Sequence, residues 1–96
     1  MTASQVLQFG ASLSIRDVTD YAVQIRSLLD DGPIELDLKR VETIDTAGLQ
    51  LLLAVARDAE RRGFRLRMRG AEAIRTGAAR VLGLDTQLAS LTEILP

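Results

Sequence analysis

Three segments in which apolar and polar residues alternate are each followed by a segment with apolar residues at helical spacing. The alternating segments lie at 7–15, 34–38 and 64–68, and the helical segments at about 18–29, 48–62 and 74–82. Alternation predicts strands, and a spacing of three to four residues predicts amphipathic helices. A chain that repeats strand and helix in this way favours parallel strands joined by right-handed crossovers. The order of the patterns therefore predicts an α/β fold.

Two parts of this pattern leave room for short strands. Segment 7–15 is either one half-buried strand or two short strands that meet at Gly10, and segment 89–95 can add a short edge strand.

Parallel strands that are covered on both faces read as continuous apolar runs, whereas these strands alternate. We therefore expect the helices to lie mainly on one face of the sheet. The other face would be solvated and charged, with cross-strand pairs rather than a binding site; its charged residues are Glu35, Asp37, Arg65, Arg67 and Arg69.

Length and composition exclude several kinds of protein. The 96 residues correspond to a single domain, residues 1–96. The chain has no cysteine and no histidine, which removes disulfides, thiolate metal sites and the commonest general base, so we expect neither a metal nor a cofactor. A net charge of −1 gives no indication of nucleic-acid binding. The apolar runs are far shorter than the roughly 20 residues that span a bilayer, so we expect a cytoplasmic, soluble domain without membrane insertion.

The segment Asp45-Thr46-Ala47-Gly48 lies where the second strand region ends and the second helix begins. Two interpretations are open. Asp45 or Thr46 can be the N-cap that accepts hydrogen bonds from the first turn, a contribution of about 1 kcal/mol. Alternatively, Thr46 can accept a phosphate, whose charge a helix N-terminus tolerates. Both can hold for the same residues.

The helix that follows carries apolar residues on two sides. At about 100° per residue, one stripe faces the core; it consists of Leu49, Leu52, Leu53, Ala56 and Ala59. Leu51, Ala54 and Val55 fall on the opposite side, close to Thr46. This outer patch is either a face that docks on a partner, or an accidental patch, or a contact for a terminal segment.

Segment 36–70, LDLKRVETIDTAGLQLLLAVARDAERRGFRLRMRG, resembles the central part of STAS domains. These domains carry an apolar-Asp-[Ser/Thr]-x-Gly-Leu signature between a strand and a long helix, which matches residues 44–49 here. The resemblance extends from about Val6 to Leu84. It implies a STAS-type α/β fold, with a small, mainly parallel or mixed sheet of about four to five strands and helices mainly on one face.

The resemblance also implies a function. In the bacterial anti-sigma factor antagonists of this family, the residue after the signature Asp is phosphorylated by the anti-sigma factor, an ATP-dependent serine/threonine kinase. The unphosphorylated form binds that kinase. Carried over, the phosphoacceptor is Thr46, and the chain is a non-enzymatic, cytoplasmic signalling module. The residues expected to contact the partner are Ser14, Asp45, Thr46, Ala47, Gly48, Leu51 and Val55.

Two departures from that pattern leave the partner open. The acceptor is Thr46 rather than the usual Ser, and Ser14 stands where many members carry an acid before the first helix. The sequence also resembles the small STAS subunit of the bacterial Mla phospholipid-transport system, which docks on the ATPase subunit. In that case Thr46 is an interface residue that needs no phosphate. An enzyme has little support, because carboxylates are the only catalytic candidates and Asp45 has no second acid nearby in the sequence.

Overall fold

The main sheet of the computed structural model, which describes residues 5–96, has four parallel strands in the order β1-β3-β5-β6. Its strands are β1 (Gln5–Gln8), β3 (Ile34–Asp37), β5 (Leu66–Arg69) and β6 (Thr92–Leu95). A separate pair of short parallel strands joins β2 (Ser12–Leu13) to β4 (Thr43–Ile44). The helices are α1 (Val18–Asp31), α2 (Thr46–Arg61), α3 (Glu72–Thr76), α4 (Ala78–Val81) and α5 (Asp85–Leu91). The predicted α/β class with parallel strands is confirmed.

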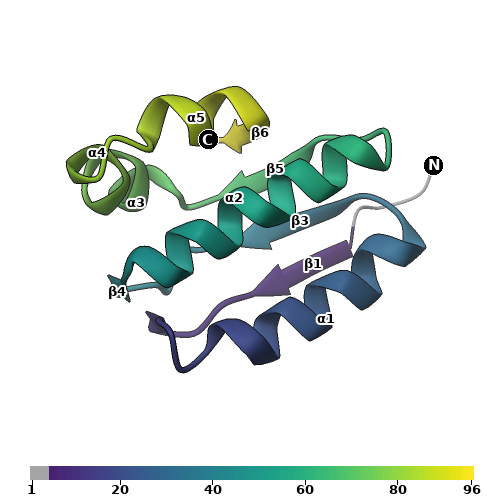
Figure 1. Cartoon of the computed structure of the whole chain (residues 1–96), viewed down its shortest axis with the longest axis horizontal. Coiled ribbons are helices and arrows are strands. Elements are labelled where there is room, and N and C mark those ends of the chain that lie inside the picture. Colours follow the sequence, from purple (N-terminus) through teal and green to yellow (C-terminus); the bar gives the residue numbers. More distant parts are fainter. Residues whose placement is uncertain (1–4) are drawn as a thin grey trace.

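The two long helices, α1 and α2, lie side by side across the same face of the sheet (Figure 1). Helix α2 has a central position, because it contacts α1 on one flank and α5 on the other. Strand β4 and the start of α2 lie at the end of the molecule where the main strands finish, beside α3 and α4 (Figure 1). The prediction that helices cover mainly one face is therefore confirmed.

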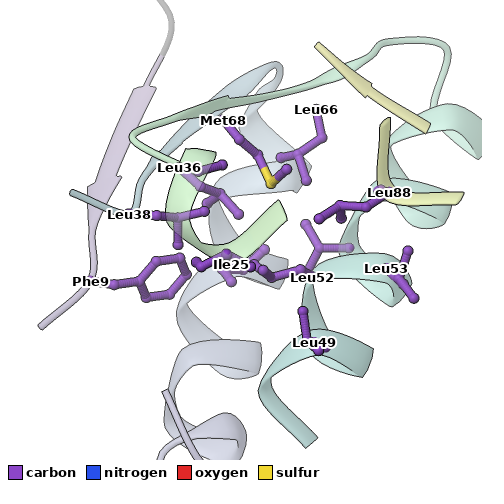
Figure 2. Close-up of a cluster of buried hydrophobic side chains, with 14 of the residues drawn as sticks. Phe9, Ile25, Leu36, Leu38, Leu49, Leu52, Leu53, Leu66, Met68 and Leu88 are labelled. Carbon is purple, nitrogen blue, oxygen red and sulfur yellow. The ribbon is translucent and has the colours of Figure 1, made fainter. Parts of the chain in front are cut away.

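The hydrophobic core lies between this helical layer and the sheet. Leu36 of β3 and Met68 of β5 are fully buried and stand opposite each other in the strand register. Figure 2 shows that these strand residues face Leu52 of α2 and Ile25 of α1, both of which are also buried. Burial of apolar side chains from both layers fixes the helices on the sheet.

The opposite face of the sheet carries the expected cross-strand charge pairs. Arg69 Nε lies 3.0 Å from Glu35 Oε2, and Arg67 Nε lies 3.5 Å from Glu93 Oε2. The expectation that Asp37 is solvated is wrong, because only 7% of this residue is exposed. Its carboxylate accepts hydrogen bonds from Gln8 Nε2 and from the backbone N–H of Lys39, which satisfy the buried charge.

Segment 7–15 forms two short strands rather than one. β1 belongs to the main sheet, whereas β2 leaves it and pairs with β4, a strand that the sequence did not indicate. Ile15 lies beyond β2, and its side chain is 67% exposed, so the prediction that it continues a strand is wrong. The change of direction follows Phe9, whose ring packs edge-on against Tyr21 of α1 with centroids 4.5 Å apart.

The C-terminal part differs from the prediction of one helix over 74–82. The helix is interrupted at Gly77, which separates α3 from α4, and α5 follows before the edge strand β6. Val81, one of the apolar residues whose spacing indicated this helix, is 84% exposed. The predicted edge strand is present, but it begins at Thr92. Residues 89–91, which the prediction included in the strand, form the end of α5. Thr92 Oγ1 donates a 2.7 Å hydrogen bond to the Leu88 carbonyl at this junction.

Because α2 lies at the centre of the fold, substitutions on its buried side should lower the free energy of unfolding much more than substitutions on its outer side. Leu52 is fully buried, so Leu52→Ala should lower the free energy of unfolding by about 2–5 kcal/mol through lost burial and a cavity. Gln50 is exposed on the same helix, and Gln50→Ala should change it by no more than about 0.5 kcal/mol. Urea denaturation measures both values. Similar losses in the two variants would contradict the orientation of α2.

Candidate functional site

The Asp45 carboxylate joins two segments that are distant in the sequence. Asp45 is the N-cap of α2, and its Oδ1 accepts a 2.9 Å hydrogen bond from the backbone N–H of Gly48. Its Oδ2 accepts a second 2.9 Å hydrogen bond from the backbone N–H of Ile15. The predicted capping role is confirmed, and the bond to Ile15 is an addition that the sequence did not indicate. One carboxylate thus holds both the first turn of α2 and the loop that precedes α1.

These hydrogen bonds stabilise the ionised carboxylate. They hold the pKa of Asp45 below its ordinary value of 3.8, with the Gly48 N–H as the largest cause and the Ile15 N–H as the next. Asp45 is therefore an anion whose two oxygens are engaged in structural bonds. Such a group is a poor general base, because it has little tendency to take up a proton near neutral pH.

A second aspartate orders the loop between β2 and α1. Asp17 Oδ2 accepts hydrogen bonds from the Ser14 N–H and from the Ser14 hydroxyl, both at 3.0 Å, and from the Ser12 hydroxyl at 3.2 Å. The Ser14 backbone N–H is the largest cause of the lowered pKa of Asp17. Asp17 occupies the N-cap position of α1, but its side chain bonds back to the loop instead of capping the helix. Ser14 is half-buried in this turn, beside Ile15.

Thr46 is the first residue of α2, and it is exposed. Within residues 5–96 its hydroxyl makes no hydrogen bond to a neighbouring group, in contrast to the side chain of Asp45 next to it. Ala47 follows and is half-buried at the mouth of a groove. The geometry therefore leaves the Thr46 hydroxyl accessible at a helix N-terminus, where the backbone N–H groups favour negative charge.

Gly48 has a structural role that removes it from the surface. It is buried, and a Cβ built on it would lie 2.3 Å from the Leu13 carbonyl oxygen and 2.8 Å from Cγ1 of Ile44. The start of α2 thus rests directly on the backbone of β2, an approach that any larger residue would block. The burial of Gly48 contradicts the prediction that this residue contacts a partner directly.

The outer patch predicted on α2 is only partly present. Val55 is 6% exposed, so its assignment to an outer docking face is wrong. The reason is the second helix, because α1 packs along this flank of α2 and covers the side chain. Leu51 is half-buried and packs partly against the core, while Ala54 is exposed.

An open groove with a volume of about 540 Å³ runs between α1 and α2 beside Thr46. Its walls are mostly apolar, and they come from both helices and from the loop before α1. They include Ile15, Val18, Ala22, Val23, Arg26, Ala47, Gln50, Leu51 and Ala54. A smaller hollow of about 180 Å³ continues along the same pair of helices and shares Leu51 and Ala54 with the groove. We call this whole feature the α1–α2 groove.

The sequence did not predict that α1 contributes to this surface. Val23 is 67% exposed, and it lies outside the apolar stripe of α1, which was a usable signal of a surface position. Ile15 gave no such signal, because it continued the alternation of the preceding segment. The structure brings Ser14 and Ile15 close to Asp45, Thr46 and Ala47, although about 30 residues separate them.

Among residues 5–96, no three His, Cys, Asp or Glu side chains are placed to hold a metal ion together. Over the same residues, none of the helices is both long and apolar enough to cross a bilayer.

Comparison with known proteins gives one family and several structural neighbours. A family model described as "Mlab, STAS domain" matches residues 2–95. A sulfate transporter family protein from Wolinella succinogenes has a similar structure, with a TM-score of 0.70 and 20% identity over 95% of this chain and 75% of that one. A protein named as a candidate anti-sigma factor antagonist from Thermotoga maritima gives a TM-score of 0.72 and 21% identity, over 98% of this chain and 81% of that one. No curated protein matches the sequence.

The close contact at Gly48 predicts that adding a single methyl group at this position strongly destabilises the fold. Gly48→Ala should lower the free energy of unfolding by at least about 1–3 kcal/mol, because the new Cβ forces the start of α2 away from the Leu13 carbonyl. Gly10→Ala is the matched control. A Cβ there meets only the Tyr21 hydroxyl at 3.8 Å, an ordinary contact. Thermal and urea unfolding compare the two variants, and equal stability would show that the close approach is absent.

The capping carboxylate also predicts how stability depends on pH. Since folding lowers the pKa of Asp45, its contribution is present above the unfolded value of about 3.8 and is lost as pH falls through the lower folded value. The free energy of unfolding should therefore decrease between pH 6 and pH 3. Asp45→Ser keeps a capping oxygen but has no carboxylate, so it should show a smaller decrease between these pH values. An unchanged decrease in this variant would mean that Asp45 does not contribute to the pH dependence.

Proposed function

The chain belongs to the STAS domain family, and we propose that it is a non-enzymatic regulatory module that docks on a partner protein through the surface around Thr46. The observation that carries the proposal is the exposed Thr46 hydroxyl at the start of α2, directly beside the apolar α1–α2 groove. The groove supplies apolar area for docking, and the hydroxyl supplies a position where one modification changes the charge.

The proposed partner is an anti-sigma factor of the serine/threonine kinase type, with Thr46 as the phosphoacceptor. The Asp45-Thr46-Ala47-Gly48-Leu49 signature supports this role, as does the similar fold of the protein named as an anti-sigma factor antagonist candidate. A phosphate on Thr46 would add about −1.5 to −2 charges to a surface that docks while it is neutral. Binding of the partner would then weaken through desolvation and repulsion between like charges.

A second candidate partner is the ATPase subunit of a phospholipid-transport system. The description of the matching family model, "Mlab, STAS domain", favours it. In this case Thr46, Ala47 and the groove form a permanent interface, and the hydroxyl contributes a hydrogen bond without phosphate. Both partners use ATP, so we place the chain in the cytoplasm with either of them. The two functions differ in whether Thr46 is ever phosphorylated.

The chemistry of the site supports a binding module rather than an enzyme. The chain has neither histidine nor cysteine, and the ionisable side chain at this site that could act in acid–base catalysis is a carboxylate. Asp45, the carboxylate beside the groove, is already engaged by the N–H groups of Gly48 and Ile15. The proposed partner-binding set is Ser14, Ile15, Val23, Asp45, Thr46, Ala47, Leu51 and Ala54, in which Asp45 acts by positioning its neighbours.

A charge at Thr46 should weaken docking without unfolding the domain. Thr46→Glu should reduce affinity for the true partner at least about tenfold, equivalent to about 1.4 kcal/mol, whereas the neutral control Thr46→Gln should retain most of it. Titration calorimetry with purified candidate kinase and ATPase subunits measures both. Circular dichroism melting should give similar midpoints for the two variants. Equal affinity of wild-type and Thr46→Glu protein for the partner would exclude Thr46 as the switch.

Phosphorylation separates the two candidate partners. Incubation with the kinase and radiolabelled ATP should label the wild-type chain but not Thr46→Val, which keeps the shape of the side chain and lacks the hydroxyl. Val23→Asp should reduce binding to either partner, because it places a charge on the apolar wall of the groove at an exposed position. Stable binding of the ATPase subunit without any labelling would select the transport function.

A further inference from the structure

The loop before α1 is attached to the start of α2 through a single carboxylate oxygen. Among residues 5–96, the hydrogen bond from the Ile15 N–H to Asp45 Oδ2, at 2.9 Å, is the one that joins residues 14–17 to the first turn of α2. The other Asp45 oxygen is occupied by the Gly48 N–H at 2.9 Å. The preceding residue, Leu13, is held separately by the Asp45 backbone N–H, so what depends on the orientation of the Asp45 side chain is the position of the Ile15 N–H.

The side chain held in this way belongs to the groove. Ile15 is 67% exposed, and it lines the α1–α2 groove together with Ala47, which follows Thr46 in the chain. Because little of the Ile15 side chain packs against the core, its backbone hydrogen bond has a large influence on where the side chain lies. A change at Asp45 would thus alter the apolar rim of the groove while the core remains intact.

Thr46 follows Asp45 in the chain and is the first residue of α2. The N–H groups of Gly48, Ile15 and Ala47 all stabilise the Asp45 carboxylate. A phosphate on Thr46 would bring about two more negative charges and three strong acceptor oxygens to this place. It would repel the carboxylate and compete with it for these N–H groups.

We propose that Asp45 couples the charge on Thr46 to the position of Ile15. A negative group on Thr46 weakens the hydrogen bond between Asp45 and Ile15, and the Ile15 side chain then leaves the rim of the groove. Modification would act twice, by placing charge on the docking surface and by removing an apolar contact from it. This coupling rests on the proposed function, in which a partner reads Thr46. Asp45 is a positioning residue in this scheme.

The coupling can be measured on the free protein by NMR. An amide proton that donates to a carboxylate resonates downfield and follows the ionisation of that carboxylate. In the wild-type chain, the Ile15 amide proton should therefore move upfield as pH falls through the lowered pKa of Asp45. Asp45→Ser retains one oxygen for the cap but is too short to reach Ile15, so this titration should disappear. Ser12→Ala removes a bond to Asp17 in the same loop and should leave the titration unchanged.

The charge on Thr46 provides the decisive comparison. At pH 6, Thr46→Glu should move the Ile15 amide proton upfield, towards its position in Asp45→Ser, while Thr46→Gln should leave it at the wild-type position. In the Asp45→Ser background, Thr46→Glu should cause no further movement, because the coupling residue is absent. The comparison between Thr46→Glu and Thr46→Gln still tests the coupling if Asp45→Ser fails to fold.

Two results would overturn the coupling. One is an Ile15 amide at its wild-type position in Thr46→Glu, and the other is an equal displacement by Thr46→Glu with and without the Asp45 carboxylate. Measurements of partner binding distinguish a failure of the coupling from a failure of the proposed function. Loss of the partner without movement of Ile15 would overturn the coupling and support direct repulsion at Thr46. Movement of Ile15 with undiminished partner binding would support the coupling and overturn the proposed switch.

Discussion

The contact between the start of α2 and the backbone of β2 determines how the rest of the molecule is arranged. Gly48 lies so close to the Leu13 carbonyl that a Cβ would stand 2.3 Å from its oxygen. The Asp45 N–H donates to the same carbonyl at 3.3 Å. Together these contacts seat the first turn of α2 on the short β2–β4 pair. From there the helix crosses the main sheet between α1 and α5.

The central position of α2 explains where a partner can dock. Helix α2 is packed against the sheet and on both flanks, so residues such as Val55 are largely buried. What remains accessible beside the groove is Thr46 at the start of the helix and an outer strip that includes Gln50 and Ala54. The neighbouring surface of α1 and the loop at Ile15 complete the α1–α2 groove. The docking surface that we propose is therefore composed of two helices and a loop, rather than of one helix face.

The neighbouring residues Asp45 and Thr46 have different tasks. Asp45 is an anion held by N–H groups from two segments, and it stabilises the fold. Thr46 is exposed at the helix N-terminus, so a change of its charge leaves the core contacts in place. In the function that we propose, this separation would let the surface change sign locally without loss of the folded domain. A helix N-terminus suits such a switch, because its backbone N–H groups tolerate added negative charge.

The sequence by itself determined the α/β class, the order of parallel strands and helices, and a helix cap at Asp45 or Thr46. These features depend on local periodicity and on capping chemistry, which short segments carry in full. Only the tertiary structure decided that Val55 is buried, that Ile15 and Val23 line a groove, and that β2 leaves the main sheet to pair with β4. The pattern along one helix records how apolar each side is. It does not record which neighbour covers that side, because α1 and α5 reach α2 through contacts between residues far apart in the chain.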